Sequence, residues 1–216
     1  MNPSDVLLIT AQKALNTLFA PPAARRTCPT IPAVQAEPPT ALTADEKTHA
    51  AGLMRINHVG EICAQALYTA QALATSNPGL QAHFAQAAQE EEDHLAWTHD
   101  RLLALGARPS VFNPLWYGGA FALGFAAGKL GDAISLGFLK ETELQVKEHL
   151  ESHLDGVAHA LPLSDDASRA VVAQMRDEEA AHAQDAERLG AAELPAAAKG
   201  AMRAMANVMK SVAYRL

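Results

Sequence analysis

The chain has 216 residues, of which 49% are hydrophobic and 19% charged, and its formal net charge is −7. Such a chain can bury a core in one domain, which excludes a disordered or fibrous protein. Its acidic balance argues against nucleic acid as a main partner.

Helices are the expected elements throughout. The sequence holds 46 alanines but only 15 valines and isoleucines together, and alanine favours helices whereas β-branched residues favour strands. Residues 4–19 are predicted to form a short amphipathic helix. Residues 20–41 contain six of the twelve prolines and are predicted to be a linker or an arm on the surface. We therefore divide the chain into an N-terminal segment, 1–42, and a helical bundle, 43–216.

The bundle is expected to contain four long helices and a shorter C-terminal helix. The first starts at a capping box, Thr43-Ala44-Asp45-Glu46, and extends to about Ser76. The second covers about 79–105, the third about 118–154 after a loop around Asn113-Pro114, the fourth about 166–190, and the last about 195–214. Long helices with short connections are typical of a helical bundle.

The third predicted helix is rich in glycine and apolar residues. Gly124 and Gly128 form a GxxxG pair, which lets another helix or a flat ligand approach the backbone. Residues 109–128 carry no charge and have the minimum length for a membrane crossing. The prolines and the charges that follow favour instead a segment that lies in the membrane interface or lines an apolar pocket.

The N-terminal segment does not resemble a targeting signal. Prolines follow Arg25-Arg26 where a twin-arginine signal would have an apolar region, and no Arg-rich transit segment precedes them. A bacterial protein is therefore expected. Cys28 and Cys63 fit neither a disulfide framework nor a zinc motif, which favours a reducing compartment; Cys63 is interpreted as a packing residue.

Two Glu-x-x-His pairs lie on separate predicted helices. They are Glu91 with His94 and Glu179 with His182, and this spacing places both side chains of a pair on one helical face. The two other long helices offer the acids Glu61 and Glu143. One carboxylate from each of two helices and a Glu-x-x-His pair from each of two others make the ligand set of a dinuclear site in a bundle.

The charge of this set points to metal. Four glutamates that face one core are unfavourable as bare anions, and two divalent cations would cancel their charge. Oxygen-rich ligands with one nitrogen per metal suit iron or manganese. A third pair, Glu46 and His49, lies in the first turn of its helix, where Glu46 is expected to serve the cap.

Spacing leaves some choices open. Glu90 and Glu178 lie four residues before the two histidines and are alternatives to Glu91 and Glu179. Asp93, Asp177 and Asp185 are weaker candidates for holding a histidine N–H, with exposure as the default. The remaining histidines are expected to be exposed or structural; they include His58, His83, His99, His153 and His159.

Several motifs resemble those of the demethoxyubiquinone hydroxylases, the di-iron monooxygenases of ubiquinone biosynthesis. They are Asn57-His58-Val59-Gly60-Glu61-Ile62-Cys63-Ala64, Glu90-Glu91-Glu92-Asp93-His94-Leu95, Glu141-Thr142-Glu143-Leu144-Gln145-Val146 with His149-Leu150, Asp177-Glu178-Glu179-Ala180-Ala181-His182-Ala183, and the closing Ala213-Tyr214-Arg215-Leu216. The resemblance covers about residues 43–216, and the segment before residue 43 contributes little to it.

The resemblance implies a ferritin-like four-helix bundle, all-α, with extra N- and C-terminal helices. By matched position, Glu61, Glu91 and His94 would serve one iron, and Glu143, Glu179 and His182 the other, with some glutamates bridging. The matched motif alone selects Glu143 over Glu141. His149 is a candidate residue next to the metal ligands or near an electron donor. Tyr68 lies seven residues after Glu61, and its side chain is a candidate for pointing into the site.

The family hydroxylates the ring of a polyprenylated methoxy-methyl-benzoquinol with dioxygen, and the two electrons come from an external donor, for which NADH is a candidate. The implied location is the cytoplasmic side of the bacterial inner membrane, as a peripheral protein. A homo-oligomer and a complex with other proteins of ubiquinone biosynthesis are open alternatives, and nucleic acid is not an expected partner.

Three rival interpretations remain. They are a ferritin-like iron store, a membrane-associated bundle without metal, and an oxygenase of the same kind with a different substrate. The last predicted helix carries Lys199, Arg203 and Lys210 among apolar residues, and it would either lie on an anionic membrane surface or pack as a cap.

Overall fold

The computed structural model describes residues 2–30, 41–155 and 160–216, and in these ranges the chain forms seven helices and no strand. The helices are α1 (Pro3–Phe19), α2 (Ala44–Ala74), α3 (Pro78–Ala104), α4 (Asn113–Lys129), α5 (Asp132–Asp155), α6 (Asp166–Arg188) and α7 (Ala196–Ala213). The predicted all-α class is confirmed. The division at residue 42 stays a prediction.

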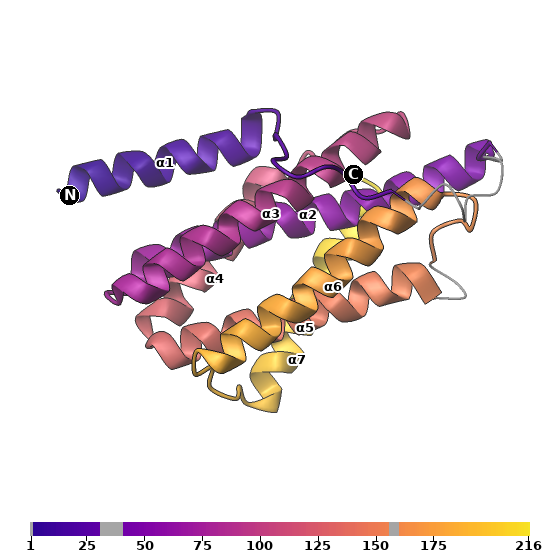
Figure 1. Cartoon of the computed structure of the whole chain (residues 1–216). Coiled ribbons are helices and arrows are strands. Elements are labelled where there is room, and N and C mark those ends of the chain that lie inside the picture. The colour runs from indigo at the N-terminus through magenta and orange to yellow at the C-terminus, as the bar shows by residue number, and fades with distance from the viewer. Residues whose placement is uncertain (1, 31–40, 156–159) are drawn as a thin grey trace.

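Four long helices form the bundle (Figure 1). The hairpin of α2 and α3 faces the hairpin of α5 and α6, and α4 connects the two hairpins while it packs along α2. Helix α1 lies against α2 and α4, and α7 lies against α2 and α5. The core between the hairpins is therefore shared by helices that are distant in sequence, which allows one site to draw on four of them.

The helix starts follow local hydrogen-bond chemistry. At the start of α2 the Thr43 hydroxyl accepts from the Glu46 N–H at 3.2 Å, and the Glu46 carboxylate accepts from the Thr43 N–H at 2.8 Å. This reciprocal pair is the predicted capping box. Asn77 caps α3 without such a reciprocal pair: its Oδ1 accepts from the N–H groups of Gly79 and Leu80, and Pro78 lies in the first turn, where its missing N–H costs nothing.

The prediction of one helix from about 118 to 154 is wrong. Helix α4 ends at Lys129 and α5 begins at Asp132, and Gly131 between them has a φ of 117°. That backbone region is open to glycine and strained for other residues, so the helix stops there. The loop expected around Asn113-Pro114 is instead the first turn of α4, a position that tolerates proline.

The glycine pair of α4 serves close helix packing. A Cβ added at Gly124 would lie 2.7 Å from Leu67 Cδ1 on α2, and one added at Gly128 would collide with Ala74 Cβ. The backbones of α2 and α4 approach each other at these two points because neither glycine has a side chain. Of the two predicted uses of the pair, the approach of another helix is the one observed.

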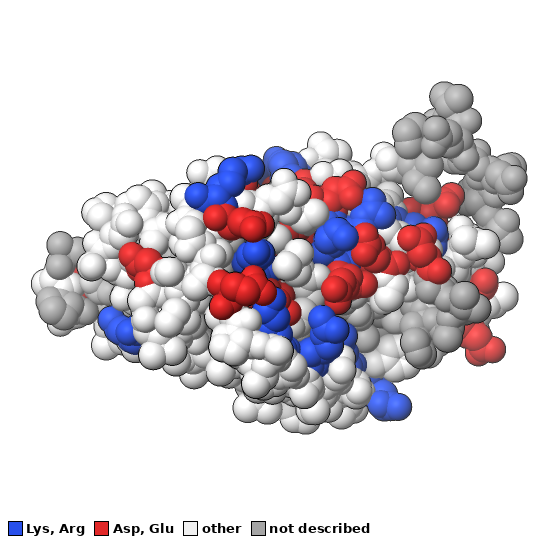
Figure 2. All heavy atoms as spheres, turned by 90° about the horizontal axis from the view of Figure 1, so that it is seen from below, with Lys and Arg blue, Asp and Glu red and all other residues white. Residues whose placement is uncertain are grey.

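The molecular surface combines apolar and mixed-charge regions. Helix α1 exposes Leu7, Leu8, Leu15 and Phe19. On the face in Figure 2, acidic and basic side chains are interspersed. Ion pairs between neighbouring side chains include Lys147–Glu151 and Lys199–Glu141. Across the described ranges, every helix falls short of the length or apolarity that a membrane crossing needs.

Candidate metal centre

Helices α2, α3, α5 and α6 bring six side chains together in the bundle core. All six are buried, and their ligand-type atoms form two overlapping groups, each within 4.8 Å. The first group is Glu61, Glu91, His94 and Glu179, and the second is Glu91, Glu143, Glu179 and His182. All six predicted ligand positions are thus close together, and Glu91 and Glu179 belong to both groups.

The Glu-x-x-His spacing explains the inner geometry. On α3, His94 Nδ1 lies 2.8 Å from Glu91 Oε2, and on α6, His182 Nδ1 lies 3.5 Å from Glu179 Oε2. The histidines also reach across the bundle, because His182 Nδ1 is 2.8 Å from Glu91 Oε1 and His94 Nδ1 is 3.5 Å from Glu179 Oε1. Both imidazoles therefore present Nδ1 to the same set of carboxylates.

The electrostatics of the cluster call for cations. Burial, followed by the nearby carboxylate of Glu91, raises the pKa of Glu61 well above its usual value. Burial, followed by Glu179, does the same to the pKa of Glu143. Burial also disfavours charge on Glu91, but His94 and His182 outweigh it and lower the pKa of that carboxyl. Four carboxylates and two imidazoles in one dry core fit a pair of divalent ions as a donor set.

Glu90 and Glu178 lie on the outer side of the histidines. The Nε2–H of His94 donates to Glu178 Oε2 at 2.7 Å, and the Nε2–H of His182 donates to Glu90 Oε2 at 3.2 Å. Each carboxylate thus crosses to the histidine of the opposite helix. An outer carboxylate of this kind fixes the ring orientation and leaves Nδ1 free to face the centre.

The other predicted candidates lie in different places. The Tyr68 hydroxyl donates to Glu143 Oε1 at 2.7 Å, inside the core. Glu141 points to α7, where its Oε2 is 3.3 Å from Lys199 Nζ. The ring of His149 lies on the cavity wall, 4.1 Å from the ring of His153. Burial and, after it, the charge of His153 lower the pKa of His149 to about 2.

The remaining histidines and acids are mostly structural. His49 contacts the Tyr214 hydroxyl at 2.8 Å and the Ala160 carbonyl at 3.0 Å. His58 is buried against His99, and burial lowers its pKa to about 3. Asp177 and Asp185 pair with Arg176 and Arg188 on the surface of α6, and His159 lies outside the described residues.

Sequence reasoning missed one contributor to the site, Arg26 of the proline-rich arm. Its guanidinium pairs with Glu178 and with Asp93, which is buried and not exposed as expected by default. The local signal was only an Arg-Arg pair among prolines, and nothing in its spacing indicates which helices it reaches.

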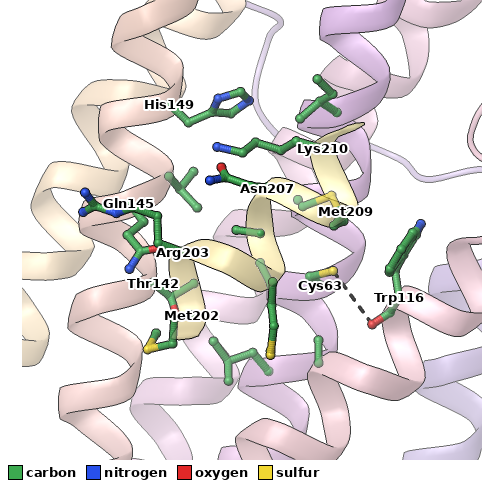
Figure 3. Close-up of a pocket in the computed structure, with 18 of the residues that line it drawn as sticks. Cys63, Trp116, Thr142, Gln145, His149, Met202, Arg203, Asn207, Met209 and Lys210 are labelled. Carbon is green, nitrogen blue, oxygen red and sulfur yellow. Dashed lines mark hydrogen bonds between the residues drawn. The ribbon is translucent and has the colours of Figure 1, made fainter. Parts of the chain in front are cut away.

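A cavity of about 730 Å³ adjoins the centre. Helices α2, α4, α5 and α7 form most of its wall, to which Glu61 of α2, Glu143 of α5 and Glu179 of α6 also belong. Figure 3 shows His149, Asn207 and Lys210 together near one end of the cavity. Cys63 of α2, Trp116 of α4 and Met209 of α7 also line it. Most of the lining is apolar, so the cavity suits a largely hydrophobic molecule that reaches the carboxylate cluster.

Comparison with known proteins gives a consistent result. Residues 48–213 match the family described as ubiquinone biosynthesis protein COQ7. The chain is 57% identical over 212 residues to 3-demethoxyubiquinol 3-hydroxylase of Albidiferax ferrireducens, covering 98% of this chain and 97% of the relative. It is 57% identical to the enzyme of the same name from Polaromonas naphthalenivorans, with 98% of each chain covered. The same-named Xanthomonas oryzae enzyme is 51% identical over 100% of this chain and 95% of the relative.

Proposed function

The chain belongs to the ubiquinone biosynthesis protein COQ7 family, and on this premise we propose that it is a 3-demethoxyubiquinol 3-hydroxylase with a dinuclear metal centre. One observation carries the proposal. Both Glu-x-x-His pairs meet Glu61 and Glu143 in the core, and the resulting cluster opens on an apolar cavity. A hydrophobic quinol and a metal-dependent hydroxylation need these two features side by side.

The ligand assignment follows the two groups. We assign Glu61, Glu91 and His94 to one ion and Glu143, Glu179 and His182 to the other. Membership of both groups supports Glu91 and Glu179 as the bridging carboxylates. Oxygen-rich donors with one imidazole per ion suit iron, and two bound ferrous ions supply the redox chemistry with dioxygen that no side chain here provides.

The overall reaction sets what the protein has to supply. One oxygen atom of dioxygen enters a ring C–H bond to form the new hydroxyl. The other leaves as water, with two electrons and one proton from an external hydride donor and a second proton from solvent. We propose NADH as that donor. The chain's own tasks are to bind and orient the quinol ring, to exclude water, and to hold the carboxylates in place.

Tyr68 has a defined part in holding the carboxylates. Its buried hydroxyl donates to Glu143 Oε1 at 2.7 Å, so one oxygen of Glu143 is fixed and the other remains available. A hydrogen bond to a ligating carboxylate restricts its orientation. We propose that this contact holds Glu143 in place beside the cavity.

The cavity gives the substrate its orientation. We place the quinol ring beside Glu61 and Glu143 and the polyprenyl tail along α4 and α7. Lining residues Leu115 and Leu123 of α4, and Met205 and Val208 of α7, are partly exposed to solvent. Exposed apolar side chains at the mouth of a lipid-binding cavity are suited to contact with a membrane surface. We propose that this face meets the cytoplasmic side of the bacterial inner membrane.

The proposal is tested by the quinones of a host that lacks the gene. We expect the deletion strain to accumulate a quinone lighter than ubiquinone by one methoxy group. The intact gene should restore ubiquinone, whereas Glu179→Ala should not. Glu187→Ala, at an exposed position of the same helix, is the matched control and should restore it. Normal ubiquinone in the deletion strain, or rescue by a correctly folded Glu179→Ala protein, would refute the proposal.

A further inference from the structure

The outer contacts of the two histidines are unequal. Glu178, which holds His94 Nε2, has only 19% of its side chain exposed, whereas Glu90, which holds His182 Nε2, has 43% exposed. The first contact measures 2.7 Å and the second 3.2 Å. The two halves of the centre have the same kind of candidate ligands but differ in the carboxylates that contact the outer histidine nitrogens.

Arg26 contacts the outer carboxylate of only one half, that of Glu178. Its Nη1 and Nη2 donate to the two oxygens of Glu178 at 2.6 and 2.9 Å, while its Nε donates to Asp93 Oδ2. The guanidinium also lies 4.9 Å from the ring centre of Trp97. A bidentate arginine restrains a carboxylate in both position and plane, which a single point charge does not.

The arm that carries Arg26 is itself held in place. The backbone N–H groups of Arg25 and Arg26 donate to Asp93 Oδ1 at 2.6 and 3.4 Å. Asp93 is buried on α3 and Glu178 lies on α6, so the arm bridges the two helices that carry the Glu-x-x-His pairs. Among the described contacts of Glu90, by contrast, the partners are Gln86 and His182, both without permanent positive charge.

We propose that Arg26 is a positioning residue for the metal centre: by fixing Glu178 it fixes the ring of His94, and the ion held by Glu61, Glu91 and His94 is bound more tightly than the other. The inference rests on the proposed metal centre. Outer partners of a ligating histidine typically change metal affinity by about 10- to 100-fold. When the ion binds, an outer carboxylate that is already restrained loses less conformational entropy than a free one does.

The test is anaerobic titration of the full-length metal-free protein with Fe²⁺, with a chelating dye as competitor. We expect two ions per chain in the wild type, with unequal affinities. Arg26→Gln should weaken the tighter ion about tenfold or more, and Arg26→Lys should recover only part of the loss. Arg25→Gln is the matched control, because it keeps the backbone donors to Asp93, and it should leave both affinities unchanged.

A second readout separates positioning from general loss of stability. With Co²⁺ in place of Fe²⁺, the visible spectrum of the first equivalent should change in Arg26→Gln and in Glu178→Gln. The two substitutions combined should weaken the tighter ion no further than either alone, because they break one chain of contacts. Glu90→Gln should weaken the other ion instead.

The outcomes distinguish this inference from the proposed function. A wild-type protein that binds no metal would overturn both. A wild type with two ions and an Arg26→Gln variant with the same two affinities and the same Co²⁺ spectrum would overturn the role of Arg26 alone.

Discussion

The half of the centre around His94 and the half around His182 differ in what surrounds them. Each half combines a Glu-x-x-His pair with a glutamate from a second helix. Outside that set, His94 contacts Glu178, whose carboxylate is paired with Arg26, whereas His182 contacts Glu90, whose side chain is more exposed to solvent. Tyr68, in turn, holds Glu143 of the second half. Similar sequence patterns therefore place similar candidate ligands in the core, and contacts from outside the pattern differ between the two halves.

The largest effect is expected at Glu91, and it tests whether this residue binds the ions of both halves. Glu91 belongs to both ligand groups and Glu61 to one. Glu91→Ala should therefore abolish binding of both ions and, with the metal, turnover. Glu61→Ala should leave one ion bound. Metal content per chain after dialysis distinguishes the two variants, and equal losses would contradict the assignment of Glu91 as a bridge.

Metal removal should make stability depend on pH across both halves. The pKa values of Glu61 and Glu143 are raised by burial and by neighbouring carboxylates, and the pKa values of His94 and His182 are raised because, despite burial, nearby glutamates favour their charged forms. From pH 5 to 8 the unfolded chain releases protons that the folded metal-free chain keeps. All four groups therefore lower the free energy of unfolding as the pH rises.

Urea unfolding of the metal-free protein at pH 5.5 and pH 8 measures this effect. Bound metal should reverse the trend, because the ligands must lose their protons to bind it. His58 and His149 act in the opposite direction over this range, because burial lowers their pKa values. A metal-free protein that is more stable at pH 8 than at pH 5.5 would therefore show that the four raised groups do not dominate the pH dependence.

The packing of α4 against α2 supports the half that contains Glu61. Gly128→Ala would place a Cβ on Ala74, and such overpacking typically costs about 1 to 3 kcal/mol. Gly118→Ala is the control, because a Cβ there meets open space and alanine favours a helix over glycine by about 0.5 to 1 kcal/mol. Thermal unfolding should move in opposite directions for the two variants, and equal shifts would argue against close packing at Gly128.

The contact between Tyr68 and Glu143 should make a smaller contribution. Tyr68→Phe keeps the ring and removes a hydroxyl that donates to Glu143 in the core. A hydrogen bond to a charged group is worth about 1.5 to 3 kcal/mol, and to a neutral one about 1 kcal/mol. Because Glu143 is expected to be protonated without metal, the loss in unfolding free energy should be larger in the metal-loaded protein. The same loss in both forms would indicate that the hydroxyl serves packing only.

The smallest effect comes from an ion pair that resembles the Arg26 contact in type but not in surroundings. Arg203 and Glu148 lie 3.3 Å apart, with 57% and 61% of their side chains exposed. Exposed pairs are worth about 0 to 1 kcal/mol. Arg203→Gln should leave metal affinity unchanged and shift stability by less than about 0.5 kcal/mol. A loss of metal comparable to that of Arg26→Gln would show that any arginine on the surface affects the centre, and the comparison between the halves would lose its basis.

Much of the fold followed from local rules. The capping box at Thr43 depends on contacts between residues close in sequence and was predicted. The start predicted for the second long helix, about residue 79, lies one residue after the observed start of α3 at Pro78. The break between α4 and α5 was not, because Gly131 is one of several glycines in that stretch. Which of them adopts a positive φ depends on where α4 and α5 must pack, and the sequence pattern does not indicate these packing positions.

The candidate site also divides into features that follow from local sequence and features that follow from tertiary packing. The sequence by itself determined the helical class through its composition, and the two Glu-x-x-His pairs through their spacing, because a spacing of three residues specifies one face of a helix. The choice of Glu143 and the family followed from motifs that resemble those of a known family. Only the tertiary structure decided that Glu178 crosses to His94, that Glu90 crosses to His182, and that Arg26 reaches Glu178 over a separation of 152 residues. Helical periodicity states which residues share a face, but what lies opposite that face is decided when the helices pack.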